Sequence, residues 1–164
     1  MVMMRRRRLS GVSAAVWEGA VMGEERSTGW FSAIRTGLEW QDADHRHLIG
    51  AMDLLEDSLS AGQQGQVLDD ILDRIDEYAQ HHFAREEERM QATAYPDEAA
   101  HRLAHDDFME QVEGFVQRRR QDRSQGRLIL SDDLAIALRR WFVRHIQTMD
   151  QDLAAHLKQA GCLD

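Results

Sequence analysis

The apolar residues of this chain recur every three or four positions over four long segments that no proline interrupts. This spacing places apolar side chains on one face of an α-helix. We expect helices over residues 43–59, 66–92, 97–118 and 131–158, with Asp42 as the N-cap of the first and a polar loop over 119–130. The single proline, Pro96, falls in a connection. Four helices with short connections predict an all-α fold, an antiparallel up-down four-helix bundle with an N-terminal extension.

The first 28 residues differ from the rest of the chain. Arg5 to Arg8 precede an apolar stretch over 9–21, which resembles an export signal, but this stretch is short and contains Glu18. We therefore expect residues 1–28 to form a flexible extension, residues 29–160 to form the bundle, and the protein to be cytoplasmic rather than exported. An alternative is that translation begins at Met22.

Charge and cysteine content exclude several classes of protein. The chain has 164 residues and a formal net charge of −9, which argues against a general nucleic-acid binder. No apolar run approaches the roughly 18 residues that a membrane span needs. Cys162 is the sole cysteine, so no internal disulfide can form.

Polar residues occupy positions on the predicted inner face of every helix. Burying an ionisable group costs several kcal/mol unless the group is paired or binds a metal. Taken singly, each residue has an ordinary explanation, such as a hydrogen-bonded core histidine or a pair on the helix surface. One metal cluster at the centre of the bundle explains them all: His45, His82, Glu86, His101, His105 and His145.

Asp150 is a less obvious member of this group. It follows His145 by five residues, an offset of about 140° on an ideal helix. It is either a solvated aspartate or a ligand brought in by a bridging position or a π-type turn. Imidazole suits iron, copper, zinc and nickel, and carboxylates can bridge two cations. Five imidazoles and two carboxylates are too many for one tetrahedral zinc and suit two six-coordinate metals.

Four sequence motifs together resemble the hemerythrin family, specifically its single-domain bacterial members. They are DADHRHL at 42–48, HFAREE at 82–87, HRLAH at 101–105 and WFVRHIQTMD at 141–150. The resemblance covers about residues 30–157. It implies a centre of two iron ions with an oxo or hydroxo bridge and O2 as its ligand.

The resemblance also assigns the ligands. It implies that His101, His105 and His145 bind one iron, that His45 and His82 bind the other, and that Glu86 and Asp150 bridge them. One iron keeps an open position, where the family binds O2 reversibly. This implies an oxygen carrier, store or delivery protein and not an enzyme.

Two other functions stay open at this point. One is an O2 or redox sensor, with Arg5 to Arg8 as a contact element. The other is a di-iron enzyme that acts on peroxide, nitric oxide or ferrous iron. The sequence identifies no protein partner.

Three residues depart from the family pattern. Gln41 replaces an apolar residue, Asp44 replaces a glutamine and either orients His45 or lies in water, and Phe142 replaces a leucine and narrows the predicted pocket. We expect an apolar wall around the metals and three histidines on the surface. The wall candidates are Leu48, Phe108, Trp141, Phe142 and Ile146, and the surface histidines are His47, His81 and His156.

Overall fold

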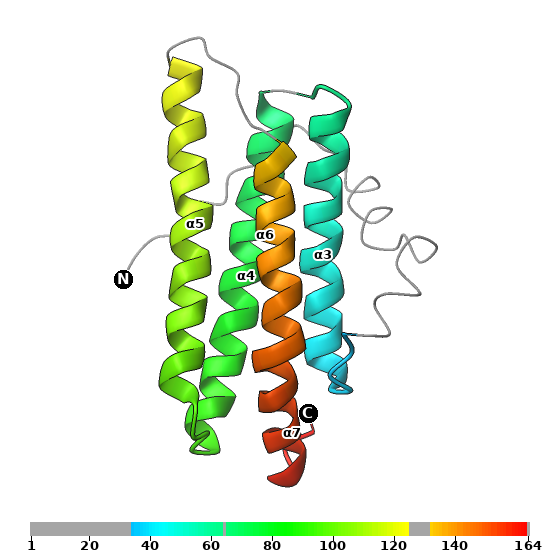
Figure 1. Cartoon of the computed structure of the whole chain (residues 1–164), viewed down its shortest axis with the longest axis vertical. Coiled ribbons are helices and arrows are strands. Elements are labelled where there is room, and N and C mark those ends of the chain that lie inside the picture. The colour runs from blue at the N-terminus through cyan, green and yellow to red at the C-terminus, as the bar shows by residue number, and fades with distance from the viewer. Residues whose placement is uncertain (1–33, 64, 125–131, 164) are drawn as a thin grey trace.

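The computed structural model describes residues 34–63, 65–124 and 132–163, and within these ranges the chain forms helices and no strand. The elements are α3 (Glu39–Ser60), α4 (Gln66–Ala92), α5 (Glu98–Ser124), α6 (Asp132–His145), the π-helix η1 (Ile146–Asp150) and α7 (Gln151–Gln159). In Figure 1, α3, α4, α5 and α6 run side by side with alternating direction. The predicted four-helix bundle is therefore confirmed. The predicted extension over 1–28 lies outside the described residues.

Each helix packs against two neighbours, which closes the bundle around one interior. Helix α3 contacts α4 and α6, and α5 contacts the same two helices. Helix α6 is followed directly by η1 and α7, so these three elements form one continuous helical segment (Figure 1). None of the described helices is long and apolar enough to cross a membrane.

Two boundaries differ from the sequence prediction, namely the end of α5 and the start of α3. Helix α5 continues to Ser124, beyond the predicted end at 118. Arg119, which the prediction placed in a loop, is buried and donates hydrogen bonds to the Asp69 carboxylate and the Gly65 carbonyl. Both partners lie at the start of α4, so Arg119 joins this part of α5 to α4.

Asp42 is not the N-cap of the first helix, because α3 begins at Glu39 and Asp42 lies inside its first turn. The Asp42 carboxylate instead accepts hydrogen bonds from the Thr36 N–H at 2.8 Å, the Thr36 hydroxyl at 3.0 Å and the Gly37 N–H at 3.1 Å. Gly37 has a φ of +79°, a conformation that glycine adopts without strain. Asp42 therefore holds the chain that leads into α3.

The apolar interior is divided into two clusters along the bundle. The larger cluster contains Leu48 of α3, Ala79 of α4, Phe108 of α5 and Phe142 of α6. The smaller cluster lies toward α7 and is formed by Leu38, Met90, Tyr95, Leu153, Ala154 and Leu157. On every helix, the predicted site residues fall in the sequence between members of these two clusters. The polar residues therefore form a layer between two apolar layers.

Replacing Asp42 with alanine tests its role at the start of α3. The change leaves the buried Thr36 N–H and the Gly37 N–H without their acceptor, and the loss at the buried Thr36 N–H alone costs about 1–3 kcal/mol. We expect a fall of at least that size in the free energy of unfolding, measured by urea denaturation. The matched control is Glu110→Ala, which removes an exposed carboxylate of α5 and should leave stability nearly unchanged. Equal stability of the two variants would contradict this role.

Candidate metal centre

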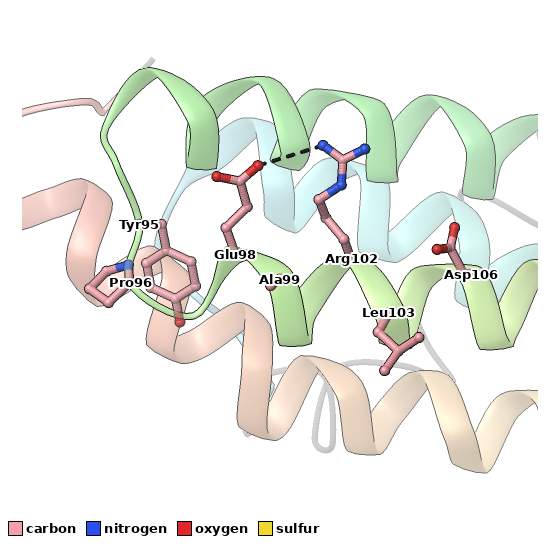
Figure 2. A pocket seen from close by; sticks show the side chains of 7 residues that line it. All are labelled: Tyr95, Pro96, Glu98, Ala99, Arg102, Leu103 and Asp106. Atoms are coloured by element: carbon pink, nitrogen blue, oxygen red, sulfur yellow. Dashed lines mark ion pairs between the residues drawn. The ribbon is translucent and has the colours of Figure 1, made fainter.

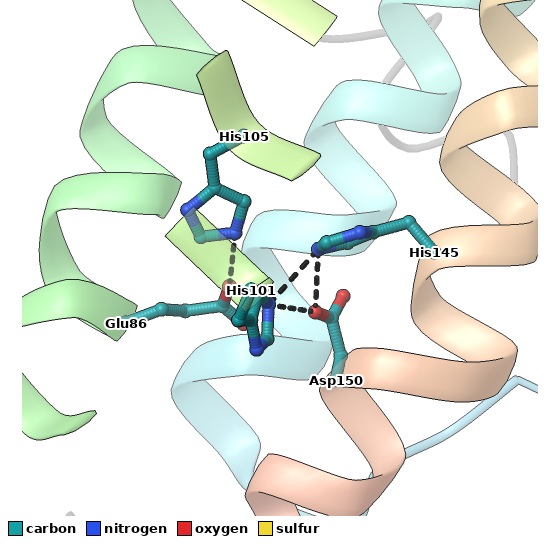
Figure 3. A group of neighbouring side chains, drawn as sticks. All are labelled: Glu86, His101, His105, His145 and Asp150. Atoms are coloured by element: carbon teal, nitrogen blue, oxygen red, sulfur yellow. Dashed lines mark hydrogen bonds and ion pairs between the residues drawn. The ribbon is translucent and has the colours of Figure 1, made fainter. Parts of the chain in front are cut away.

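The structure brings all seven sequence-predicted site residues together in the middle layer of the bundle. Each of them is at most 4% exposed. They form two overlapping groups, and within each group one ligand atom per residue lies within 4.8 Å of the others. The three-histidine group is Glu86, His101, His105, His145 and Asp150 (Figure 3), and the two-histidine group is His45, His82, Glu86 and Asp150.

Helical spacing explains how most of these side chains meet. His82 and Glu86 on α4, and His101 and His105 on α5, are each four residues apart and therefore share one face of their helix. His45 comes from the middle of α3 and His145 from the end of α6. Figure 3 shows the three-histidine group, whose side chains point toward one another from α4, α5, α6 and η1.

A π-helix places Asp150 in the cluster. The five residues Ile146–Asp150 form η1, whose wider turn brings position i+5 over position i. Asp150 Oδ1 consequently lies 3.0 Å from Nε2 of His145, and the aspartate is fully buried. The π-type turn that the sequence allowed is therefore present, and the alternative of a solvated aspartate is wrong.

Glu86 and Asp150 lie between the two histidine groups. Glu86 directs Oε2 toward Nε2 of His101 at 3.4 Å and of His105 at 3.2 Å, and directs Oε1 toward Nε2 of His82 at 3.5 Å. The two oxygens of Asp150 likewise face different histidine groups. Its Oδ1 lies 3.1 Å from His101 Nε2, and its Oδ2 lies 3.0 Å from His45 Nε2. Each carboxylate thus presents one oxygen to each group.

The imidazole nitrogens and carboxylate oxygens of this cluster are better suited to binding a metal than to hydrogen-bonding with one another. Buried polar atoms are normally hydrogen-bonded, yet several donor atoms here have no hydrogen-bond partner among the described residues. They include Nε2 of His45, His82 and His105, Oε2 of Glu86 and Oδ2 of Asp150. A cation binds the nitrogens of neutral imidazoles and the oxygens of carboxylates directly, and iron is among the metals that accept both. The residues therefore fit a buried metal site.

Electrostatic coupling shifts the pKa values within the cluster. Burial and the Asp150 charge would raise the pKa of Glu86, but the imidazoles of His82, His101 and His105 hold it well below its usual range. Burial would lower the pKa of His101, but Asp150 and Glu86 raise it to about 9. Without a metal, positive charge on imidazole stabilises the two carboxylates.

Two further carboxylates contact the outer nitrogens of site histidines. Glu87 Oε1 lies 3.1 Å from His105 Nδ1, and because a carboxylate only accepts, Nδ1 donates and Nε2 is left free to face the cluster. Sequence reasoning did not single out Glu87, although it adjoins Glu86 in the HFAREE motif. Asp44 lies against His82, 3.7 Å from its Nδ1, and pairs with Arg85 at 2.8 Å. The expectation that Asp44 orients His45 or lies in water is therefore wrong.

The five predicted wall residues belong to the larger apolar cluster or pack against it, and two of them, Trp141 and Phe142, contact site histidines. Of the wall candidates, Leu48, Phe108, Phe142 and Ile146 are fully buried. Trp141 is half-buried and stacks on the His145 ring with centroids 4.8 Å apart. Phe83 was not predicted, but it stacks on His105 at 3.9 Å. Its position next to His82 in the sequence was the signal that could have identified it.

The remaining histidines lie outside the cluster, but only His81 is exposed as predicted. His47 is half-buried and stacks on Tyr78 with centroids 5.6 Å apart. Nε2 of His156 lies 3.2 Å from the Thr93 carbonyl oxygen, so His156 connects α7 to the end of α4. His81 is therefore fully at the surface as predicted, whereas the other two are partly covered by these contacts.

A surface pocket at the start of α5 is distinct from the cluster. Figure 2 shows its lining, which contains no histidine and includes a 3.5 Å ion pair between Glu98 and Arg102. Tyr95 forms one wall, and its ring centroid lies 6.3 Å from that of His101. The pocket therefore borders the metal layer without including any of the seven residues.

Comparison with known proteins gives one consistent result. The family model described as "Hemerythrin HHE cation binding domain" matches residues 36–157. A bacteriohemerythrin of Stenotrophomonas maltophilia is 33% identical over 79% of this chain and 84% of its own length. A bacteriohemerythrin of Ralstonia nicotianae is 28% identical over 80% of this chain and 90% of its own length. One of Pseudomonas paraeruginosa is 26% identical over 74% of this chain and 75% of its own length. No solved structure shows a significant match to the chain.

The metal-free protein should show a distinctive pH dependence of its stability. Because the pKa of His101 is raised from 6.5 to about 9 in the folded state, its protonated form stabilises the fold fully below pH 6.5. This stabilisation is lost as the pH rises through about 9. Glu86 and Asp150 have lowered pKa values and stay ionised throughout this window. We expect the free energy of unfolding of chelator-treated protein, measured in urea, to fall between pH 6.5 and 9, and a constant or rising stability would contradict this.

Proposed function

The chain belongs to the hemerythrin family, and on that premise we propose that it binds O2 reversibly at a non-haem di-iron centre. His101, His105 and His145 would hold one iron, and His45 and His82 the other. Glu86 and Asp150 would bridge the two. One observation carries the proposal: Glu86 and Asp150 each direct one carboxylate oxygen toward the three-histidine group and the other toward the two-histidine group.

The charge of the donor set supports reversible binding over oxidation. Five neutral imidazoles and two carboxylates place less negative charge on the metals than the four-carboxylate sets of ferritin-like proteins. The ferrous state is consequently favoured. When bound, two ferrous ions would supply the electrons that O2 binding requires.

We place O2 at the iron of the two-histidine group. This group has one imidazole fewer than the three-histidine group, so its iron would keep one coordination position open for O2. Phe142 packs edge-on against both of its histidines, with ring centroids 5.7 Å from His45 and 6.0 Å from His82. His45 and His82 are fully buried, so only a small ligand can reach them through the packed interior. The apolar wall excludes water, which disfavours release of reduced oxygen species. These features support a carrier, store or delivery role rather than catalysis.

Iron loading followed by exposure to air tests the proposal. Protein reconstituted with ferrous iron under argon should hold about two iron ions per chain. Air should then produce a visible absorption band that argon flushing removes. A protein that takes up no iron, or that oxidises in one irreversible step, would contradict reversible binding. Sustained turnover of peroxide or nitric oxide would favour an enzyme instead.

A matched pair of histidine variants localises the site in the same assay. His101→Ala removes a predicted ligand and should lower iron content to about one per chain or less. His47→Ala removes a histidine that stacks on Tyr78 outside the cluster and should leave iron content unchanged. Equal loss of iron in both variants would contradict the ligand assignment.

Replacing Phe142 with leucine tests the wall beside the two-histidine group. The smaller side chain leaves space next to His45 and His82, so water gains access to the proposed O2 position. We expect faster spontaneous loss of the oxygen-dependent absorption band, at a cost of about 1–2 kcal/mol in stability. The decay of that band after air exposure measures the effect. A slower or unchanged decay would show that Phe142 does not exclude water from the site.

A further inference from the structure

Gln41 is a fully buried amide in the metal layer that the proposed ligand set does not use. It lies one turn before His45 on α3 and therefore on the same face of the helix. Its Nε2 donates a hydrogen bond to Oε1 of Glu86. An ionised carboxylate has no proton to give, so the amide nitrogen must be the atom that faces it.

This hydrogen bond is made to the Glu86 oxygen that faces the two-histidine group. Glu86 Oε1 is the oxygen beside His82, whereas Oε2 faces His101 and His105. Gln41 therefore acts on the carboxylate arm that points toward the two-histidine group.

Packing alone does not account for an amide at this position. The Oε1 atom of Gln41 is buried and has no hydrogen-bond partner among the described residues. An apolar side chain of the same size would fill the space without an unsatisfied oxygen. Among the described residues, the hydrogen bond to Glu86 is the interaction that glutamine makes here and an apolar residue could not.

We propose that Gln41 is a positioning residue that holds Glu86 Oε1 in place for the metal of the two-histidine group. A carboxylate oxygen has more than one lone pair, so Oε1 can accept the amide hydrogen and still bind a cation. The amide restricts rotation of the Glu86 side chain before the metal arrives. Residues that orient a metal ligand in this way typically contribute 10–100-fold in metal affinity. The inference rests on the proposed di-iron site.

Stepwise iron binding to Gln41→Met protein tests this role. Methionine is close to glutamine in size and lacks the donor. Ferrous iron is titrated under argon against a chromophoric chelator, and the affinities of the two binding steps are compared with wild type. The His82→Ala variant identifies the step that belongs to the two-histidine group. We expect Gln41→Met to weaken that step by about 10–100-fold and to leave the other step within a few-fold of wild type.

Two controls separate positioning from a structural role. Leu55→Met changes a buried residue fourteen positions further along α3, about 21 Å from Gln41, and should alter neither step. Gln41→Leu, a second apolar replacement, should reproduce the selective loss. Thermal unfolding of the metal-free variants, followed by circular dichroism, shows whether the fold is retained.

The outcomes also distinguish this inference from the proposed function. If wild type binds two iron ions and Gln41→Met binds both with unchanged affinity, the positioning role is overturned and the di-iron site stands. A parallel weakening of both steps, or a lost helical signal, would show that Gln41 is structural and would also overturn it. Wild type that binds fewer than two ions contradicts the di-iron site itself, and this inference fails with it.

Discussion

The arrangement of this bundle depends on the cost of placing ionisable groups in a dry interior. Five histidines and two carboxylates, each at most 4% exposed, form one layer between two apolar clusters. Ion pairing satisfies this layer in part, as the raised pKa of His101 and the lowered pKa of Glu86 show. Several donor atoms are left without hydrogen-bond partners among the described residues, and cations are the groups that complete such a set.

The sequence predicts most of this layer because helical periodicity is a local property. The positions of His45, His82, Glu86, His101, His105 and His145 relative to their apolar neighbours were enough to place them inside. Asp150 was ambiguous because an ideal helix turns it away, and η1 resolves the ambiguity. A π-turn is one extra residue accommodated in a helix, and here it lets Asp150 meet His45 and His101 of two other helices.

Contacts between helices account for what the sequence did not predict. Asp44 contacts His82 and Arg85 of α4 rather than its neighbour His45. Gln41 reaches Glu86 across the same interface, and Arg119 of α5 contacts the start of α4 and the residue before it. Each of these partners is more than 35 residues away in the sequence. Periodicity identifies the inward face of a helix but not which residue of another helix a side chain will meet.

The spacing between the two proposed iron ions tests the account most directly. X-ray absorption at the iron edge of reconstituted protein reports the atoms around each iron without reference to any activity. The account predicts nitrogen and oxygen neighbours, imidazole scattering from the histidines, and a second iron within about 4 Å. Isolated iron ions with no neighbouring metal, or a shell without imidazole, would contradict the claim that both carboxylates bridge one dinuclear centre.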